Sequence, residues 1–293
     1  PALLWSLAVL TLAVALAGPR VPDAETKVTR EGIAIMAVVD RSGSMHARDL
    51  VKNDLSIDRL AVVKEVFRQF VLGAGAGPGR GRGRGRPDDM IGLVAFSGYA
   101  DSLCPLTLDH GNLVSMVDDL QIVRQRDEDG TALGDGLALA VERIRQSTAK
   151  SKVVILLTDG VNNTGAIEPE QAAELAASLQ IKVYCIGAGT NGTAPFPTVD
   201  PFTGRMRLEP TLVEIDDDGL RRIAEKTGGR YFRATDKQSL ADIYAEIDRL
   251  ERTKITEVRY LQYTEHFGSL VIAGLSLMAV ASIGNGTVFR ALP

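Results

Sequence analysis

Five oxygen-bearing side chains lie where apolar segments of the chain end or where helical patterns begin. Asp40, Ser42 and Ser44 alternate directly after a short apolar run. Thr131 precedes a helical pattern, and Asp159 ends another apolar run. Carboxylates and hydroxyls are hard oxygen donors, which suit Mg²⁺ or Mn²⁺. Such a set would leave one position of an octahedral cation open for a further ligand.

Alternating strands and helices would bring these residues to one edge of a sheet. Short runs rich in Val and Ile predict strands, and apolar residues at helical spacing predict the helices between them. The strands are expected at 32–40, 90–96, 152–160 and 181–189. The helices are expected at 57–72, 132–146, 169–179, 217–227 and 239–251. This order is typical of an α/β fold with a doubly wound, mostly parallel sheet, in which ligands bind at the carboxyl ends of the strands.

The motif resembles the metal-ion-dependent adhesion site of von Willebrand factor type A domains. The match lies in "DRSGSM" at 40–45, a later threonine and "TDG" at 158–160. The resemblance covers residues 32–251 and implies a Rossmann-like fold, a Mg²⁺ or Mn²⁺ ion, and an acidic residue of a partner protein as the sixth ligand. The metal ligands that it implies are Asp40, Ser42, Ser44, Thr131 and Asp159. Without a cation, the same serines could cap a helix and the aspartates could accept bonds from loop amides.

Both ends of the chain carry uncharged apolar segments. Residues 2–18 and 267–286 are predicted to be transmembrane helices, although the first segment could instead be a cleaved signal peptide. With these ends, the chain further resembles the membrane-anchored Bat group of aerotolerance proteins. That resemblance implies a non-enzymatic role in envelope assembly or stress tolerance, together with MoxR-type ATPases and other Bat-like proteins.

Two arguments about the orientation in the membrane point in opposite directions. Arg20, Lys27 and Arg30 follow the first apolar segment, and Lys254 and Arg259 precede the second. Counted alone, these cations would keep the central domain in the cytoplasm. The resemblance to the Bat group implies the opposite side, and we therefore expect an extracytoplasmic domain.

Two other functions compete with a binding module. A hydrolase could use a metal-activated water at the open position, with Asp129 or Asp135 as its general base. A polyanion-binding module could use the arginines of the Gly-Arg segment 73–87. The near balance of 33 basic and 37 acidic residues argues against general nucleic-acid binding, and this segment lacks aromatic residues for base stacking. We predict that 73–87 is a flexible surface insertion.

Two further segments follow the last predicted parallel strand. The sequence "GAGTNG" at 187–192 fits a dinucleotide-binding pattern, but the prolines that follow it are incompatible with the helix that such a site needs. We expect 191–214 instead to form an ordered rim beside the metal site that selects a partner. Cys104 and Cys185 are predicted to be reduced thiols, because two cysteines cannot form a disulfide framework.

Overall fold

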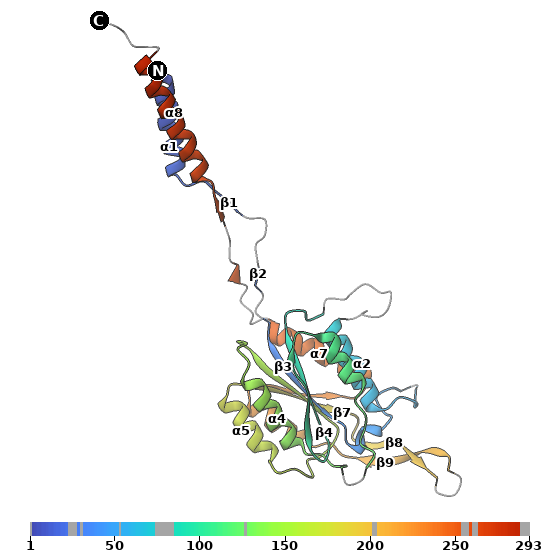
Figure 1. Cartoon of the computed structure of the whole chain (residues 1–293). Helices are drawn as coiled ribbons and strands as arrows, with labels where there is room; N and C mark the ends of the chain where they lie inside the picture. Colours follow the sequence, from blue (N-terminus) through green and yellow to red (C-terminus); the bar gives the residue numbers. More distant parts are fainter. Residues whose placement is uncertain are drawn as a thin grey trace. The chain divides into compact units, whose positions relative to one another are not determined.

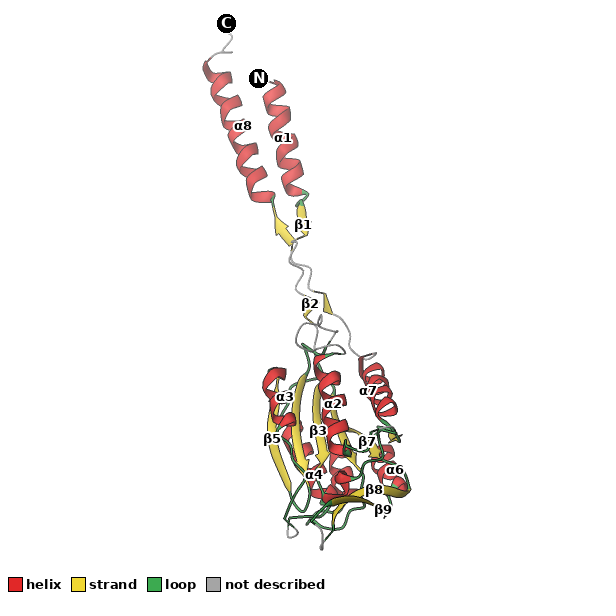
Figure 2. Ribbon diagram, turned by 90° about the vertical axis from the view of Figure 1, so that its right-hand side faces the viewer, coloured by secondary structure: helices red, strands yellow, loops and turns green. Residues whose placement is uncertain are grey.

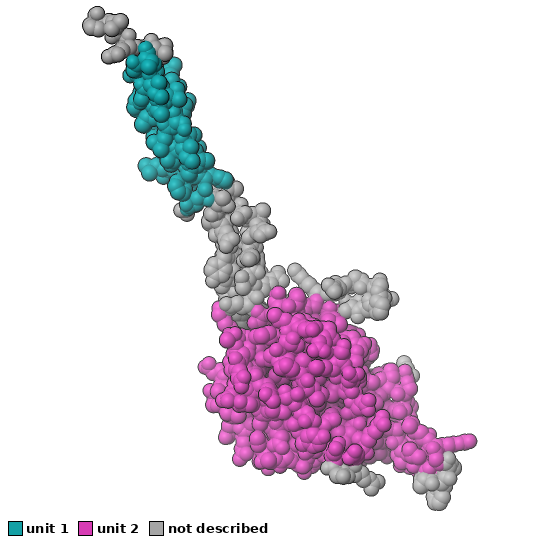
Figure 3. Space-filling view, viewed as in Figure 1, with its two compact units in different colours: residues 1–30, 257–293 teal, residues 31–256 magenta. Residues whose placement is uncertain are grey.

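A six-stranded sheet forms the centre of the larger of two compact units in the computed structural model (Figures 1 and 3). The units comprise residues 31–256 and residues 1–30 with 257–293. The structure describes residues 2–22, 28–29, 32–52, 54–73, 85–125, 128–200, 204–252, 258–259 and 263–287. In sheet order, the strands are β10 (Tyr231–Ala234), β7 (Lys182–Ala188), β6 (Lys152–Thr158), β3 (Ala34–Asp40), β4 (Met90–Phe96) and β5 (Ala100–Thr107).

The sheet is parallel except at one edge, where β5 runs antiparallel to β4. Every residue of β3 is buried, with Ile35 and Val39 in one core cluster and Met36 and Val38 in the other. A continuous apolar run such as β3 suits a strand whose two faces are both covered. The prediction of a doubly wound, mostly parallel sheet is confirmed.

Helices cover both faces of this sheet. On one face lie α2 (Arg59–Leu72), α3 (His110–Asp118) and α7 (Lys237–Arg252), and on the other lie α4 (Leu133–Arg145), α5 (Pro169–Ser178) and α6 (Asp217–Lys226). Figure 2 shows α2, α3 and α7 on the face turned toward the viewer. The five predicted helices are all present, with ends that differ from the prediction by at most two residues.

The strand order places the residues after β3 and β6 at the point where the chain reverses direction across the sheet. From β3 the chain passes to β4 on one side, and it later returns to β6 on the other side of β3. The connections that leave β3 and β6 therefore diverge to opposite faces. In doubly wound sheets, ligands bind in the crevice at this switch point. Asp40 ends β3 and Asp159 directly follows β6, so both lie there.

A two-stranded hairpin, β8 (Gly192–Val199) with β9 (Met206–Val213), follows β7. It begins at the carboxyl edge of the sheet, where we expected an ordered rim. The backbone N–H of Arg48, in the loop after β3, donates to the carbonyl oxygen of Pro195 in β8 at 3.0 Å. The hairpin thus contacts the loop that carries the predicted serines. Because β8 takes the place of a helix, the glycines at 187–192 do not form a dinucleotide-binding turn.

The end of the Gly-Arg segment differs from the prediction. Residues 74–84, with Arg82 and Arg84, lie outside the described part of the chain. Arg86, in contrast, is buried, forms ion pairs with Asp89 and Asp248, and lies 4.0 Å from the centre of the Phe70 ring. The expectation that residues 73–87 form a flexible insertion throughout is therefore wrong at Arg86, because an ion cluster and a ring hold this side chain in the domain.

The smaller unit contains two apolar helices, α1 (Ala2–Leu16) and α8 (Phe267–Thr287), which lie antiparallel and side by side (Figures 1 and 2). Strand β1 (Arg20–Pro22) pairs with β12 (Tyr263–Glu265), and β2 (Val28–Thr29) pairs with β11 (Val258–Arg259). A Cβ on Gly274 of α8 would lie 2.7 Å from the Leu12 side chain of α1. With 21 residues and a mean hydropathy of 2.0, α8 is long and apolar enough to cross a membrane, whereas α1 has 15 residues.

Candidate metal site

Asp40 is fully buried at the carboxyl end of β3. Its Oδ1 accepts a hydrogen bond from the backbone N–H of Ser42 at 2.9 Å, and its Oδ2 accepts one from the hydroxyl of Thr158 at 2.6 Å. Thr158 ends β6, the strand next to β3. Two neighbouring strands therefore fix this carboxylate.

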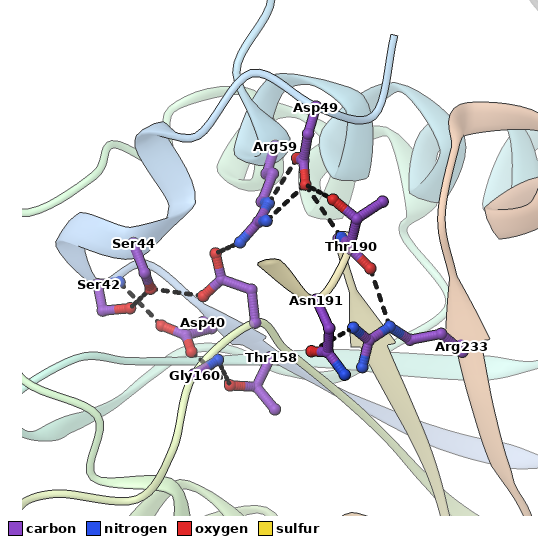
Figure 4. Close-up of polar contacts among 12 residues, drawn as sticks. Asp40, Ser42, Ser44, Asp49, Arg59, Thr158, Gly160, Thr190, Asn191 and Arg233 are labelled. Atoms are coloured by element: carbon purple, nitrogen blue, oxygen red, sulfur yellow. Dashed lines mark hydrogen bonds and ion pairs between the residues drawn. The ribbon is translucent and has the colours of Figure 1, made fainter. Parts of the chain in front are cut away.

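The two serines link Asp40 to Asp159 (Figure 4). A short 3₁₀ turn, η1 (Gly43–His46), follows β3 and brings the hydroxyls of Ser42 and Ser44 to within 2.8 Å of each other. The hydroxyl of Ser44 donates to Oδ1 of Asp159 at 2.5 Å. Asp159, like Asp40, has no exposed surface. The first loop therefore connects the two buried carboxylates through the backbone N–H of Ser42 and the hydroxyl groups of both serines.

Thr131 lies beside this group just before α4, and it is 4% exposed. A Cβ on Gly160, the residue after Asp159, would lie 3.1 Å from Oγ1 of Thr131. The backbone N–H of Thr131 donates to Oδ1 of Asn163 at 2.8 Å, so the loop after β6 fixes the threonine. Hydrogen bonds thus link Asp40, Ser42, Ser44 and Asp159, and Thr131 lies beside Gly160, the residue after Asp159.

The electrostatics of the site fit a cation. Burial and the neighbouring Asp159 carboxylate raise the pKa of Asp40 to about 7. Burial also raises the pKa of Asp159, although the Arg59 guanidinium and the Ser44 hydroxyl act in the opposite direction. A divalent cation among these oxygens would favour the charged form of both carboxylates. Two carboxylates and three hydroxyls form a hard donor set of low charge, and such a set suits Mg²⁺ or Mn²⁺.

This donor set differs from a site built of several acidic side chains. Among the residues that the structure describes, no group of three or more His, Cys, Asp and Glu side chains is arranged to hold a metal ion. Ser97, which follows β4, has a fully buried hydroxyl without a hydrogen-bond partner in the described part of the chain. Its carbonyl oxygen accepts from the N–H of Ala132, the residue after Thr131.

The sequence analysis missed two charged residues next to the site. Arg59 is fully buried at the start of α2 and forms an ion pair with Asp159 at 2.7 Å. It also pairs with Asp49 at 2.6 Å, and the side chain of Asp49 is 7% exposed. Burial alone would raise the pKa of Asp49, but the Arg59 guanidinium outweighs it and the pKa is lowered. An arginine shared by two aspartates therefore adjoins the predicted ligands.

The two candidate bases of a hydrolase have structural contacts. Asp135 lies in the first turn of α4, and its carboxylate accepts from the backbone N–H groups of Ala166 and Ile167 at 2.8 to 3.1 Å. Asp129 accepts from the backbone N–H of Gly43 at 2.8 Å. Both carboxylates thus fix loops around the site.

Cys104 and Cys185 are buried free thiols.

Comparison with known proteins assigns the fold to a family. A family model of the von Willebrand factor type A domain matches residues 34–246. An uncharacterized protein of Borreliella burgdorferi is 30% identical over 250 residues, which cover 84% of this chain and 67% of that protein. A UPF0353 protein of Mycolicibacterium gilvum is 25% identical over 309 residues, which cover 100% of this chain and 80% of that protein.

Solved structures have the same fold. BatB from Bacteroides thetaiotaomicron superposes with a TM-score of 0.56 at 23% identity, over 75% of this chain and 100% of that protein. An aerotolerance-related membrane protein from Bacteroides fragilis superposes with a TM-score of 0.55 at 23% identity, over 74% of this chain and 100% of that protein. Proximal thread matrix protein 1 from the mussel byssus was solved with zinc in its metal-ion-dependent adhesion site. It superposes with a TM-score of 0.53 at 22% identity, over 83% of this chain and 50% of that protein. The chain belongs to the von Willebrand factor type A domain family.

Proposed function

We propose that this chain is a membrane-anchored module that binds a protein partner through a divalent cation. The proposed ligands are Asp40, Ser42, Ser44, Thr131 and Asp159, and the proposed cation is Mg²⁺ or Mn²⁺. The observation that carries the proposal is the pair of fully buried carboxylates, Asp40 and Asp159, which Ser42 and Ser44 join by hydrogen bonds at the switch point of the sheet. Asp159 is paired with Arg59, whereas Asp40 accepts hydrogen bonds from neutral groups, the Ser42 N–H and the Thr158 hydroxyl. A bound cation would supply the positive charge that stabilises the ionised form of Asp40.

The ligand types support binding of an acidic group. When bound, the cation supplies a Lewis-acidic position to which an oxygen anion coordinates. Ser42, Ser44 and Thr131 carry no charge, so only Asp40 and Asp159 offset the charge of a bound ion, and Asp159 is already paired with Arg59. A carboxylate of a partner protein matches the hard character of such an ion. Proximal thread matrix protein 1 from the mussel byssus, which has the same fold, was solved with zinc in its metal-ion-dependent adhesion site, and this supports a metal site in the present chain.

We further propose that the module is anchored in the cell membrane and belongs to an envelope assembly or stress-tolerance complex. The apolar helix α8, with α1 packed beside it, supports the anchor. The structural likeness to BatB and to an aerotolerance-related membrane protein supports a role with other Bat-like proteins. The resemblance of the sequence to the Bat group implies a MoxR-type ATPase as a further partner. We place the module on the extracytoplasmic side.

The site favours binding over hydrolysis. A hydrolase needs a free general base beside the attacking water. The carboxylate of Asp135 is held by the N–H groups of Ala166 and Ile167, and Asp129 is held by Gly43. The burial of Arg86 likewise removes one arginine from the basic arm that a polyanion-binding module would use.

Thermal unfolding of the full chain in detergent tests the metal site. Mg²⁺ or Mn²⁺ is expected to raise the melting temperature, because a ligand that binds only the folded state stabilises it. Asp40→Asn and Asp159→Asn should each abolish this increase. Asp135→Asn is the matched control, since it removes a nearby carboxylate outside the ligand set, and it should keep the response. An increase of equal size in Asp40→Asn and Asp159→Asn would contradict the site.

Water proton relaxation with bound Mn²⁺ tests the open coordination position. Acetate is expected to displace Mn²⁺-bound water and lower the relaxation rate, whereas neutral acetamide at the same concentration should leave it unchanged. Equal effects of acetate and acetamide would show that the position does not select carboxylates.

A further inference from the structure

One guanidinium group is shared between the candidate site and a carboxylate outside it. Nη1 of Arg59 donates to Oδ2 of Asp159 at 2.7 Å. Nε and Nη2 donate to the two oxygens of Asp49 at 2.7 and 2.6 Å, which is a two-point pair (Figure 4). Arg59 therefore gives two of its N–H groups to Asp49 and one to a proposed metal ligand.

The backbone that follows β7 fixes this guanidinium. Gly189 has a φ of +123°, and a Cβ built on it would lie 2.3 Å from Nη2 of Arg59. The backbone N–H and the hydroxyl of Thr190 donate to Oδ2 of Asp49 at 3.0 and 3.1 Å. Because Arg59 and Asp49 are both held in this way, the positive charge stays beside Asp159.

A fixed positive charge beside a metal ligand opposes the binding of a cation. Charges interact far more strongly in a protein interior than in water, because the interior screens them less. Asp49 acts in the opposite direction, since its two-point pair takes up much of the charge of Arg59. We infer that Arg59 and Asp49 together set the cation affinity of the site. Arg59 weakens cation binding by neutralising Asp159, and Asp49 strengthens it by offsetting part of the charge of the guanidinium.

This inference rests on the proposed metal site and describes how its charge is adjusted. The carboxylates of Asp40 and Asp159 would balance the two charges of a divalent cation. Arg59 adds a positive charge that Asp49 offsets only in part at the cation, because Asp49 lies beyond the guanidinium. A loaded site thus keeps an attraction for an anionic group. Linkage requires that a partner carboxylate and the cation strengthen each other's binding.

Calorimetric titration of Mg²⁺ into the full chain in detergent tests the inference. The Asp159→Asn variant, which lacks a proposed ligand, measures Mg²⁺ binding outside the site. Arg59→Gln is expected to bind Mg²⁺ about tenfold more tightly than the wild type, which corresponds to about 1.4 kcal/mol. Asp49→Asn is expected to bind about tenfold more weakly, because Arg59 then pairs with Asp159 alone. Arg59→Lys keeps the charge and should stay within about threefold of the wild type. A purely structural role would instead weaken binding in Arg59→Gln and Asp49→Asn alike.

Two more variants distinguish a change in Mg²⁺ affinity from a general loss of stability. Arg86→Gln is the matched control, because Arg86 is also a buried arginine between two aspartates, but it precedes β4 at the opposite edge of the sheet. It should lower the melting temperature and leave Mg²⁺ affinity unchanged. The double variant Asp49→Asn with Arg59→Gln removes both charges. It should still bind Mg²⁺ more tightly than the wild type, because only Arg59 contacts Asp159 directly.

The outcomes separate the two proposals. Weaker Mg²⁺ binding in the double variant, or unchanged or tighter binding in Asp49→Asn, would overturn the role of the pair while the metal site stands. Wild-type binding no stronger than that of Asp159→Asn would contradict the metal site itself.

Discussion

At the residue scale, the site depends on charges that the fold removes from water. Arg59, Asp40 and Asp159 are fully buried, so each needs partners with good geometry. Removing one member of a buried ion pair typically costs about 3–5 kcal/mol, because the charge that remains has no partner. The arrangement of Arg59 between Asp49 and Asp159 is therefore maintained by the cost of separating these groups.

Gly189 allows a test of how closely the backbone approaches Arg59. We expect Gly189→Ala to destabilise the protein by more than Gly192→Ala. Both glycines have positive φ, of +123° and +112°, but a Cβ at position 192 would have no atom within 4 Å. Gly192→Ala should therefore cost only backbone strain, about 1–3 kcal/mol, whereas Gly189→Ala also displaces the guanidinium. Urea unfolding of both variants measures the difference, and equal losses would mean that the contact with Arg59 is unimportant.

The sequence alone selects the five proposed ligands because their residue types and spacing form a motif. It does not select Arg59, since an arginine at the start of an amphipathic helix is typical of a solvent-exposed position. Its partner Asp159 lies 100 residues away in the chain. Only the tertiary fold brings such groups together, so no local pattern could have revealed the pair.

At the element scale, the buried strands and amphipathic helices are predictable, and the edges of the sheet are not. Strand β5 contains a proline and several polar residues and is only partly buried, so no apolar run marks it. Strand β10 has four residues, which is too short for a periodic pattern. The helix α3 and the hairpin β8–β9 were likewise not predicted as such. Edge elements depend on a neighbour that the local sequence does not contain.

The carboxyl end of α7 is held by an ionised residue. Glu251 is 1% exposed and accepts hydrogen bonds from Lys182 Nζ at 2.6 Å, from the Tyr184 hydroxyl at 2.7 Å and from the Ser151 hydroxyl at 2.9 Å. Burial alone would raise the pKa of Glu251, but these donors outweigh it and lower the pKa below its usual value of 4.5. The charged form of Glu251 is thus the one that stabilises the attachment of α7 to the sheet.

The lowered pKa of Glu251 predicts an acid-sensitive helix. As the pH falls through 4.5, the unfolded chain takes up a proton at this residue before the folded chain does, so the free energy of unfolding decreases. The Glu251→Gln variant has no ionisable group at this position. Its free energy of unfolding should therefore fall less steeply than that of the wild type between about pH 6 and pH 3. Glu142→Gln, at an exposed ion pair, should follow the wild type. Parallel curves for wild type and Glu251→Gln in urea unfolding would contradict the prediction.

At the scale of the whole molecule, the chain combines a von Willebrand factor type A domain with a pair of apolar helices. Only a small part of α8 is buried, so most of its apolar surface is available to lipid. The 15 residues of α1 are fewer than the roughly 20 that span a bilayer in a straight helix. The contact between Gly274 and Leu12 lets the shorter helix associate with the longer one through a small residue.

Protease digestion of spheroplasts from bacteria that express the chain tests on which side of the membrane the domain lies. Basic residues next to the apolar segments, such as Arg20 and Arg259, favour a cytoplasmic domain, whereas the resemblance of the sequence to the Bat group implies an extracytoplasmic one. We expect the protease to degrade the domain in intact spheroplasts, while a cytoplasmic marker protein remains whole. Protection of the domain until the spheroplasts are lysed would contradict the proposed side. In that case the metal site would face cytoplasmic partners, and the charge of the flanking residues would decide the orientation.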